Sequence, residues 1–158
     1  MNKTLIIGYG NTLRRDDAVG VYAAERIRNE YPGIECITAQ QLSPEMAITL
    51  AHFKRVIFID ASDAVRELDV RTLHPGKMHK TREANTLTPQ MLLDASQELY
   101  GQVPRQTFQI EIPASDFTSG ESLSPKARIL VDQCVEIVRG LFSSDSPRPN
   151  PTGPATSV

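Results

Sequence analysis

Three carboxylates stand at positions where they would support chemistry. Asp16 and Asp17 are neighbours in the segment GYGNTLRRDDAVG, residues 8–20, and Asp60 ends the apolar run VIFID. Carboxylate oxygens bind hard divalent cations and also serve as general acids and bases. Two carboxylates that face one crevice repel each other unless a proton or a cation lies between them. The acids therefore predict a divalent metal site, provided that the fold brings Asp17 and Asp60 together.

The glycines of the same segment raise the alternative of a phosphate-binding loop. The dinucleotide fingerprint needs a third glycine where Leu13 stands, and no Gly-Lys-Ser/Thr of a Walker loop follows. A phosphate binds at a helix amino terminus because the dipole and the free N–H groups attract anions. Asp16 and Asp17 already occupy that end and would repel a phosphate, so the sequence disfavours nucleotide binding.

An acid at a helix start commonly acts as an N-cap, which accepts a hydrogen bond from a free backbone N–H group. We expect Asp16 to be this cap and Asp17 to face the ligand. Gly8 and Gly10 are expected to shape a tight turn between a strand and a helix. Asn11 is expected to stabilise that turn through its side chain.

Apolar runs and period-two alternation predict five strands, at residues 3–8, 34–39, 55–60, 67–73 and 106–112. The first three are short β-branched runs of the kind that parallel sheets bury on both faces, with crossover helices between them. The run at 67–73 alternates and follows the third strand too closely for a crossover helix, so it is expected to be an antiparallel edge strand. The sequence thus indicates an α/β fold with a mostly parallel sheet.

Helical periodicity predicts the helices that cover this sheet. The apolar faces are formed by Val19, Ala23 and Ile27; by Met46, Leu50 and Phe53; by Leu92, Ala95 and Leu99; and by Leu130, Cys134, Ile137, Val138 and Leu141. Three of the helices are expected to begin with a hydroxyl N-cap followed by proline, at Ser43-Pro44, Thr88-Pro89 and Ser124-Pro125.

Strand order decides whether the acids meet. In an open α/β sheet, ligands bind outside the carboxyl ends of the strands, where the strand order reverses. If the second and third strands flank the first on opposite sides, Asp17 and Asp60 converge on that crevice. Aspartate at a strand end is also a common turn former, so a purely structural role for Asp60 stays open at this point.

Length and composition predict one domain, residues 1–142, followed by a disordered Pro/Ser-rich tail at 143–158. The net charge of -2 and the absence of a long apolar run predict a cytoplasmic protein that binds neither nucleic acid nor membranes. Cys36 and Cys134 lack C-x-x-C spacing and are expected to be buried, inert thiols.

The chain resembles the hydrogenase maturation endopeptidases, which remove the carboxyl-terminal extension of nickel-iron hydrogenase large subunits after nickel insertion. GYGNTLRRDDAVG matches the family pattern G-x-G-N-x-L-x-x-D-(D/E)-x-x-G throughout. It is followed in order by QLSPEMA at 41–47, VIFIDA at 56–61, LTPQMLLDASQELYG at 87–101 and LSP at 123–125. The resemblance implies a three-layer α/β/α sandwich around a five-stranded mixed sheet with one antiparallel strand.

The resemblance also implies a metal-binding trio. Two members fall on Asp17 and Asp60, whereas the family histidine is replaced by Asn85. Asparagine offers a carbonyl oxygen suited to hard cations, whereas histidine nitrogen suits nickel-like ions, so affinity for such ions should fall. His79, in the same polar loop, is an alternative donor, although loop histidines are commonly solvated.

By this resemblance, the chain is a monomeric endopeptidase with Asp17 and Asp60 as catalytic residues and a hydrogenase large-subunit precursor as partner. The substrate's nickel, or another divalent metal, would be the recognition element. Neither a G-x-S-x-G elbow nor an H-E-x-x-H helix is present. Because of Asn85, the alternative is a catalytically impaired family member that serves as a binding or chaperone module for a hydrogenase subunit.

Overall fold

A computed structural model of the chain describes residues 3–76 and 86–143. Within them, five strands form one sheet in the order β2-β1-β3-β5-β4. The strands are β1 (Thr4–Tyr9), β2 (Glu35–Ala39), β3 (Arg55–Ser62), β4 (Asp69–Leu73) and β5 (Gln106–Pro113). All neighbouring pairs are parallel except β4 with β5. The mostly parallel sheet and its antiparallel edge strand are thereby confirmed.

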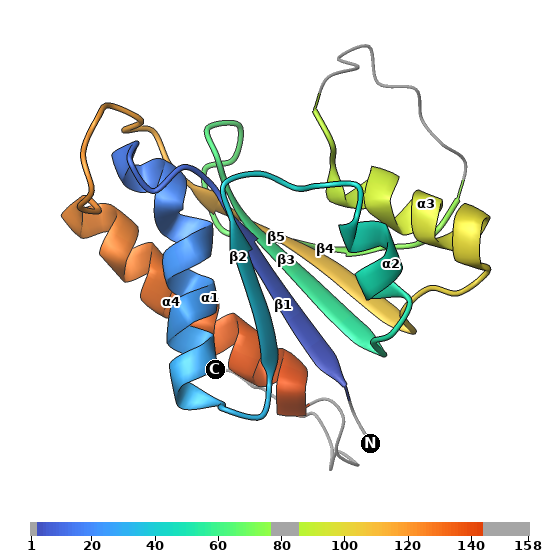
Figure 1. Cartoon of the computed structure of the whole chain (residues 1–158). Coiled ribbons are helices and arrows are strands. Elements are labelled where there is room, and N and C mark those ends of the chain that lie inside the picture. Colours follow the sequence, from blue (N-terminus) through green and yellow to red (C-terminus); the bar gives the residue numbers. More distant parts are fainter. Residues whose placement is uncertain (1–2, 77–85, 144–158) are drawn as a thin grey trace.

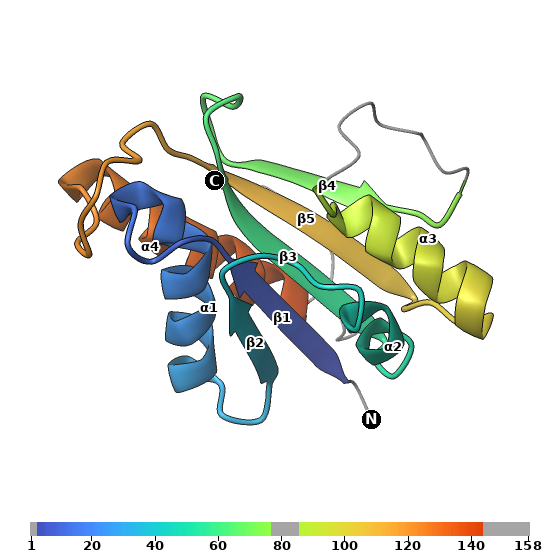
Figure 2. The same ribbon diagram turned by 45° about the horizontal axis from the view of Figure 1, so that its top comes forward.

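Helices cover both faces of the sheet. They are the 3-10 helix η1 (Arg15–Ala18) and the α-helices α1 (Val19–Glu30), α2 (Met46–Leu50), α3 (Pro89–Tyr100) and α4 (Pro125–Ser143). Figures 1 and 2 show α1 and α4 on one face and α2 and α3 on the other. The structure is therefore the expected α/β/α sandwich. Among the described residues, none of the helices is long and apolar enough to cross a membrane.

The central strand β3 is buried on both faces, which explains its uninterrupted apolar sequence. Ile57 and Ile59 belong to the core under α1 and α4, whereas Val56 and Phe58 belong to the core under α2. Because side chains alternate along a strand, the next residue, Asp60, continues the α2 side of the sheet. It lies where β3 emerges from the core, at the carboxyl edge.

Two of the three predicted hydroxyl caps are confirmed. The Thr88 side chain accepts a hydrogen bond from Met91 N, with Pro89 at the first helical position. The Ser124 hydroxyl accepts one from Ala127 N in the first turn of α4. The prediction at Ser43 was wrong, because α2 begins at Met46 and has no side-chain cap.

Most residues of the predicted apolar helix faces are buried or half-buried, although Phe53 lies beyond the end of α2. On α3, Leu92 is buried, but Leu99 on the same predicted face is 66% exposed. The helix ends at Gly101, which adopts the left-handed conformation, with φ of 67°, that glycine accepts most readily. Asn85, His79 and the predicted tail beyond 143 lie outside the described residues.

Candidate metal-contacting site at the carboxyl edge of the sheet

The turn after β1 brings the Asp17 side chain back onto the start of the glycine segment. Asn11 N donates a hydrogen bond to Asp17 Oδ2 at 2.9 Å, and Asn11 Oδ1 accepts one from Leu13 N at 2.9 Å. Gly10 has φ of 149°, and a Cβ placed there would lie 2.0 Å from the Asp17 carbonyl oxygen. Backbone and side chain of Asp17 therefore both pack against this turn.

A second glycine pair sets the contact between β1 and α1. A Cβ on Gly8 would lie 2.2 Å from the Gly20 carbonyl oxygen, and a Cβ on Gly20 would lie 2.3 Å from the Ile59 carbonyl oxygen. The helix thus crosses β1 and β3 at backbone distance. The sequence prediction missed this role of Gly20, because it sought the third glycine at the spacing of a dinucleotide fingerprint.

Asp16 does not cap the helix that it precedes, and that prediction was wrong. Neither η1 nor α1 has a side-chain cap hydrogen bond. Instead Asp16 is only 4% exposed and accepts hydrogen bonds from Ser124 N at 2.8 Å and from Ser124 Oγ at 2.7 Å. Its carboxylate therefore joins the glycine segment to the start of α4.

The two arginines of the segment hold the loop that precedes α4. Arg15 Nε lies 3.0 Å from Asp116 Oδ2, and Arg14 Nε donates to the Phe117 carbonyl oxygen at 3.1 Å. The backbone N–H groups of Arg15 and Gly120 also donate across the two loops, each at 2.9 Å, to Gly120 O and Leu13 O respectively. One wall of the carboxyl edge is thereby made of two loops bound together.

Asp60 is held on the opposite side of the edge. The pKa of its carboxyl is raised to about 7, mainly by burial and to a lesser extent by the charges of Asp17 and Glu111. Hydrogen bonds from the Tyr9 hydroxyl and the Ala61 N–H act in the other direction, because they stabilise the carboxylate form. The charge of Asp17 therefore acts on Asp60 across the carboxyl edge.

Tyr9 and Glu111 were not singled out from the sequence. Glu111 on β5 is the register partner of Asp60 on β3. Its Oε1 accepts from Arg71 Nη2 at 3.2 Å, and the same nitrogen lies 2.8 Å from Asp69 Oδ2. The signal for Glu111 was the alternation of QTFQIEI, which places an acid on the α3 side at the end of β5.

The described residues provide two carboxylates but no complete metal cage. Within residues 3–76 and 86–143, no three His, Cys, Asp or Glu side chains are arranged to hold a metal ion. Asn85 and His79, the two candidates for a third donor, lie outside these ranges. A divalent cation held by Asp17 and Asp60 would need its remaining ligands from elsewhere.

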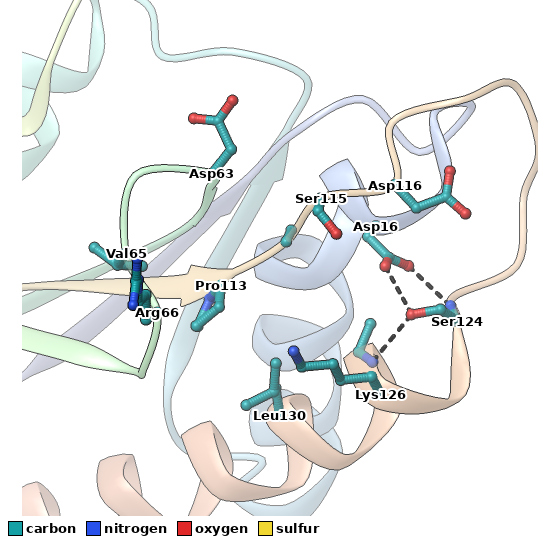
Figure 3. A pocket seen from close by; sticks show the side chains of 12 residues that line it. Asp16, Asp63, Val65, Arg66, Pro113, Ser115, Asp116, Ser124, Lys126 and Leu130 are labelled. Carbon is teal, nitrogen blue, oxygen red and sulfur yellow. Dashed lines mark hydrogen bonds between the residues drawn. The ribbon is translucent and has the colours of Figure 1, made fainter.

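A pocket of about 490 Å³ lies beside this edge, at the amino-terminal end of α4. Figure 3 shows Asp16 and Ser124 at one end and Asp63 on the far side, with Lys126 between the walls. Asp17 and Asp60 do not line it. The two adjacent acids of the glycine segment thus have different surroundings: Asp16 lines this pocket, whereas Asp17 accepts from Asn11 N in the glycine turn.

Both cysteines are unsuited to nucleophilic catalysis. Cys134 is buried and its pKa is raised to about 12 by that burial, while Cys36 is half-buried and its pKa is raised to about 11 for the same reason. A thiol with a raised pKa has little of the reactive thiolate at neutral pH. Cys134 is therefore the inert core residue that was expected, and Cys36 behaves similarly although it is only half-buried.

No protein-family model and no curated protein matches this sequence. Solved structures do match.

The hydrogenase maturating endopeptidase HybD from E. coli has a similar structure, with a TM-score of 0.70 and 17% sequence identity. The alignment covers 90% of this chain and 93% of that one. The fold is that of the hydrogenase maturation endopeptidases. The [NiFe] hydrogenase maturation proteases HybD and HycI from Thermococcus kodakarensis have TM-scores of 0.64 and 0.68, at 21% and 20% identity. They cover 88% and 90% of this chain, and the alignments span 98% and 93% of theirs. The hydrogenase maturation endopeptidase fold thus confirms the architecture implied by the sequence motifs.

Proposed function

We propose that this chain is an endopeptidase that removes the carboxyl-terminal extension of a nickel-iron hydrogenase large-subunit precursor after nickel insertion. The observation that carries the proposal is the position of Asp17 and Asp60 at one edge of a sheet with the maturation endopeptidase fold. The motif set in the sequence supports the same assignment. The partner is therefore the precursor, and its nickel, or another divalent metal in its place, is part of the substrate.

The two carboxylates are oriented before any substrate arrives. Asp17 accepts a hydrogen bond from Asn11 N, and Asp60 accepts from Tyr9 and from the Ala61 N–H group. A carboxylate has about four lone-pair sites, so each keeps capacity to bind a cation. Two protein carboxylates leave most of a coordination sphere to be filled. That suits a metal that arrives already ligated by its own protein.

In this proposal, the substrate's metal supplies Lewis acidity, which polarises the scissile carbonyl or activates water. Asp17 and Asp60 bind it and so set the distance between metal and peptide. The ion pair between Arg15 and Asp116 joins the Asp17 segment to the loop before α4. Asp60 must be ionised to act as a ligand, and its pKa of about 7 makes that step sensitive to pH near neutrality.

The test is incubation of the purified chain with a nickel-loaded large-subunit precursor that carries its extension, followed by mass spectrometry of the products. We expect one cleavage by the wild type and at least about a 100-fold lower rate for Asp17→Asn and Asp60→Asn, in line with the loss of a catalytic ligand. Asp63→Asn is the matched control, because Asp63 is exposed and lines the neighbouring pocket instead. Unchanged cleavage by Asp17→Asn would refute the proposal.

Asn85 favours one alternative function. If the oxygen donor at this position prevents productive contact with nickel, the chain binds a hydrogenase subunit without cutting it. Processing that appears only in Asn85→His, with the wild type binding the precursor, would establish this second function. Processing by the wild type would exclude it.

A further inference from the structure

A cavity of about 730 Å³ lies at the amino-terminal edge of the sheet. Its walls are the connection from α2 to β3 and the connection from α3 to β5. The two helices lie side by side on one face of the sheet (Figures 1 and 2). Strands advance about 3.3 Å per residue, so Lys54, which directly precedes β3, is about 20 Å from Asp60 near the other end of that strand. The cavity is therefore separate from the candidate metal site.

The charged side chains that line this cavity are all cationic. They are His52, Lys54 and Arg105, and all three are exposed. Of the described residues that line the cavity, none is acidic. Within residues 3–76 and 86–143, none of the ion pairs involves Lys54 or Arg105. Their charges are therefore available to a ligand.

The strand order places two of these cations in a row with a third. The strands β1, β3 and β5 are parallel neighbours, and the residues directly before them are Lys3, Lys54 and Arg105. The Lys54 N–H donates to the Lys3 carbonyl oxygen at 3.0 Å, and the Gln106 N–H donates to the Lys54 carbonyl oxygen at 3.0 Å. Neighbouring strands are about 4.8 Å apart, and like charges placed side by side destabilise a sheet. A bound anion would offset that cost.

Helix dipoles do not neutralise the cavity. Both α2 and α3 end there, and Ala51 and Gly101, the residues directly after them, line it. The carboxyl end of a helix carries about half a negative charge, so the two ends together offset about one cation. Lys54 and Arg105 alone carry two. The cavity consequently keeps a positive potential that favours an anionic ligand.

Apolar side chains complete the lining. Phe53 and Val103 are half-buried there, and Pro104 is buried. Apolar surface with cations beside it suits an extended peptide that carries both acidic and apolar side chains. A nucleic-acid strand is bound by a longer basic groove with aromatic stacking platforms, and the net charge of -2 on this chain would repel its phosphates. The lining therefore favours a peptide.

We propose that this cavity binds an acidic segment of a protein, with its carboxylates on Lys54 and Arg105 and an apolar side chain against Phe53 and Val103. The inference goes beyond the proposed function, because this binding needs neither the metal site nor cleavage. The carboxyl edge stays open when the cavity is filled, so the two surfaces can be occupied at the same time.

The test is fluorescence anisotropy of the full chain with a labelled peptide of Asp and Glu that has Leu at every third position. The same peptide with Asn and Gln in place of the acids is the ligand control. We expect the acidic peptide to bind at least about 10-fold more tightly than the neutral one. The double variant Lys54→Glu, Arg105→Glu should lower its affinity at least about 10-fold.

The matched control is the double variant Arg66→Glu, Lys126→Glu, which reverses one arginine and one lysine in the pocket at the carboxyl edge. It changes the net charge equally. At about 0.15 M salt the Debye length is about 8 Å, so charges at that edge are screened and the affinity should change less than about twofold. The milder pair Lys54→Gln, Arg105→Gln should weaken binding at least about threefold, and it keeps the test decisive if charge reversal disturbs folding.

Equal affinity for the acidic and neutral peptides, or equal losses in the two charge-reversed variants, would overturn the inference. Displacement of the peptide by an equal concentration of inorganic phosphate would also overturn it, because the cavity would then be a general anion site. Tighter binding of a single-stranded oligonucleotide than of the peptide would assign the cavity to nucleic acid instead.

Discussion

Asp16 binds Ser124 through both carboxylate oxygens, at 2.8 Å to the backbone nitrogen and 2.7 Å to the hydroxyl, across 108 positions of the sequence. The contact joins the segment that carries Asp17 to α4, which packs beside α1 on the same face of the sheet. It gives the first acid of the pair a structural role, whereas the second, Asp17, accepts a hydrogen bond within the glycine turn. Several of the expected effects of mutation depend on this division.

Asp16→Ala should lower the free energy of unfolding by about 2–4 kcal/mol, because it removes two hydrogen bonds to a buried charge and leaves the Ser124 N–H without an acceptor. Chemical denaturation monitored by circular dichroism measures the change. Asp63→Ala, an exposed acid of the same pocket, should stay within about 0.5 kcal/mol of the wild type. Equal effects of the two variants would contradict the structural role of Asp16.

Gly20→Ala should destabilise the protein by about 3 kcal/mol or more, because the new methyl group would meet the Ile59 carbonyl oxygen at 2.3 Å and the Tyr9 carbonyl oxygen at 3.0 Å. Gly140→Ala is the matched helical control. Nothing lies within 4 Å of a Cβ at that position in α4, so the change should stabilise by about 0.5–1 kcal/mol. Thermal unfolding of the wild type and the two variants measures both effects. A Gly20→Ala protein as stable as the wild type would refute the close backbone contact.

Asp60 should make the protein less stable as the pH rises. Its folded-state pKa of about 7 lies above the ordinary value of 3.8, so between these pH values the folded state binds more protons than the unfolded state. Stability from this group is complete at low pH, declines between about pH 4 and 7, and stays low above that range. Asp60→Asn removes the cost of holding a partly buried negative charge at high pH. It should raise the free energy of unfolding at pH 8 by about 2 kcal/mol, a value discounted for partial solvent screening.

The measurement for Asp60 is denaturant unfolding of the wild type and Asp60→Asn at several pH values from 4 to 8. The difference between the two curves isolates this carboxyl from the other titrating groups. A difference that does not change with pH would show that Asp60 has an ordinary pKa. The same variant should have lost precursor cleavage, so that greater stability accompanies lower activity.

Asn85→His should increase Ni²⁺ affinity of the free protein by at least about tenfold, because imidazole nitrogen suits nickel better than an amide oxygen does. Affinity for Mg²⁺, which prefers oxygen ligands, should not increase. Isothermal titration calorimetry with the two ions measures both effects. His79→Gln in the wild-type background tests the other candidate donor, and a loss of Ni²⁺ affinity there would show that His79 takes the place of the missing family histidine.

Local rules were enough to predict much of the architecture. The strand periods, the short connection before β4 and the Thr88 cap each depend on backbone preferences over a few consecutive residues. The face on which Asp60 lies followed from the same period, although β3 continues past the predicted end at residue 60 to Ser62. Local rules failed at Ser43, because a cap motif does not determine where the helix begins. They failed at Leu99, because an apolar stripe does not determine how far the neighbouring core extends along the helix.

The contacts that shape the candidate site belong to the tertiary structure alone. Asp16 meets Ser124 and Gly20 meets Ile59 because separate segments arrive at the same edge of the sheet. Tyr9 becomes the partner of Asp60 only through the parallel register of β1 with β3. Residue types and spacing therefore predicted a metal site at Asp17 and Asp60. The packing of distant segments decided which acid is buried as a structural link and which two carboxylates lie together, because burial, charge coupling and close backbone approach exist only once those segments are in contact.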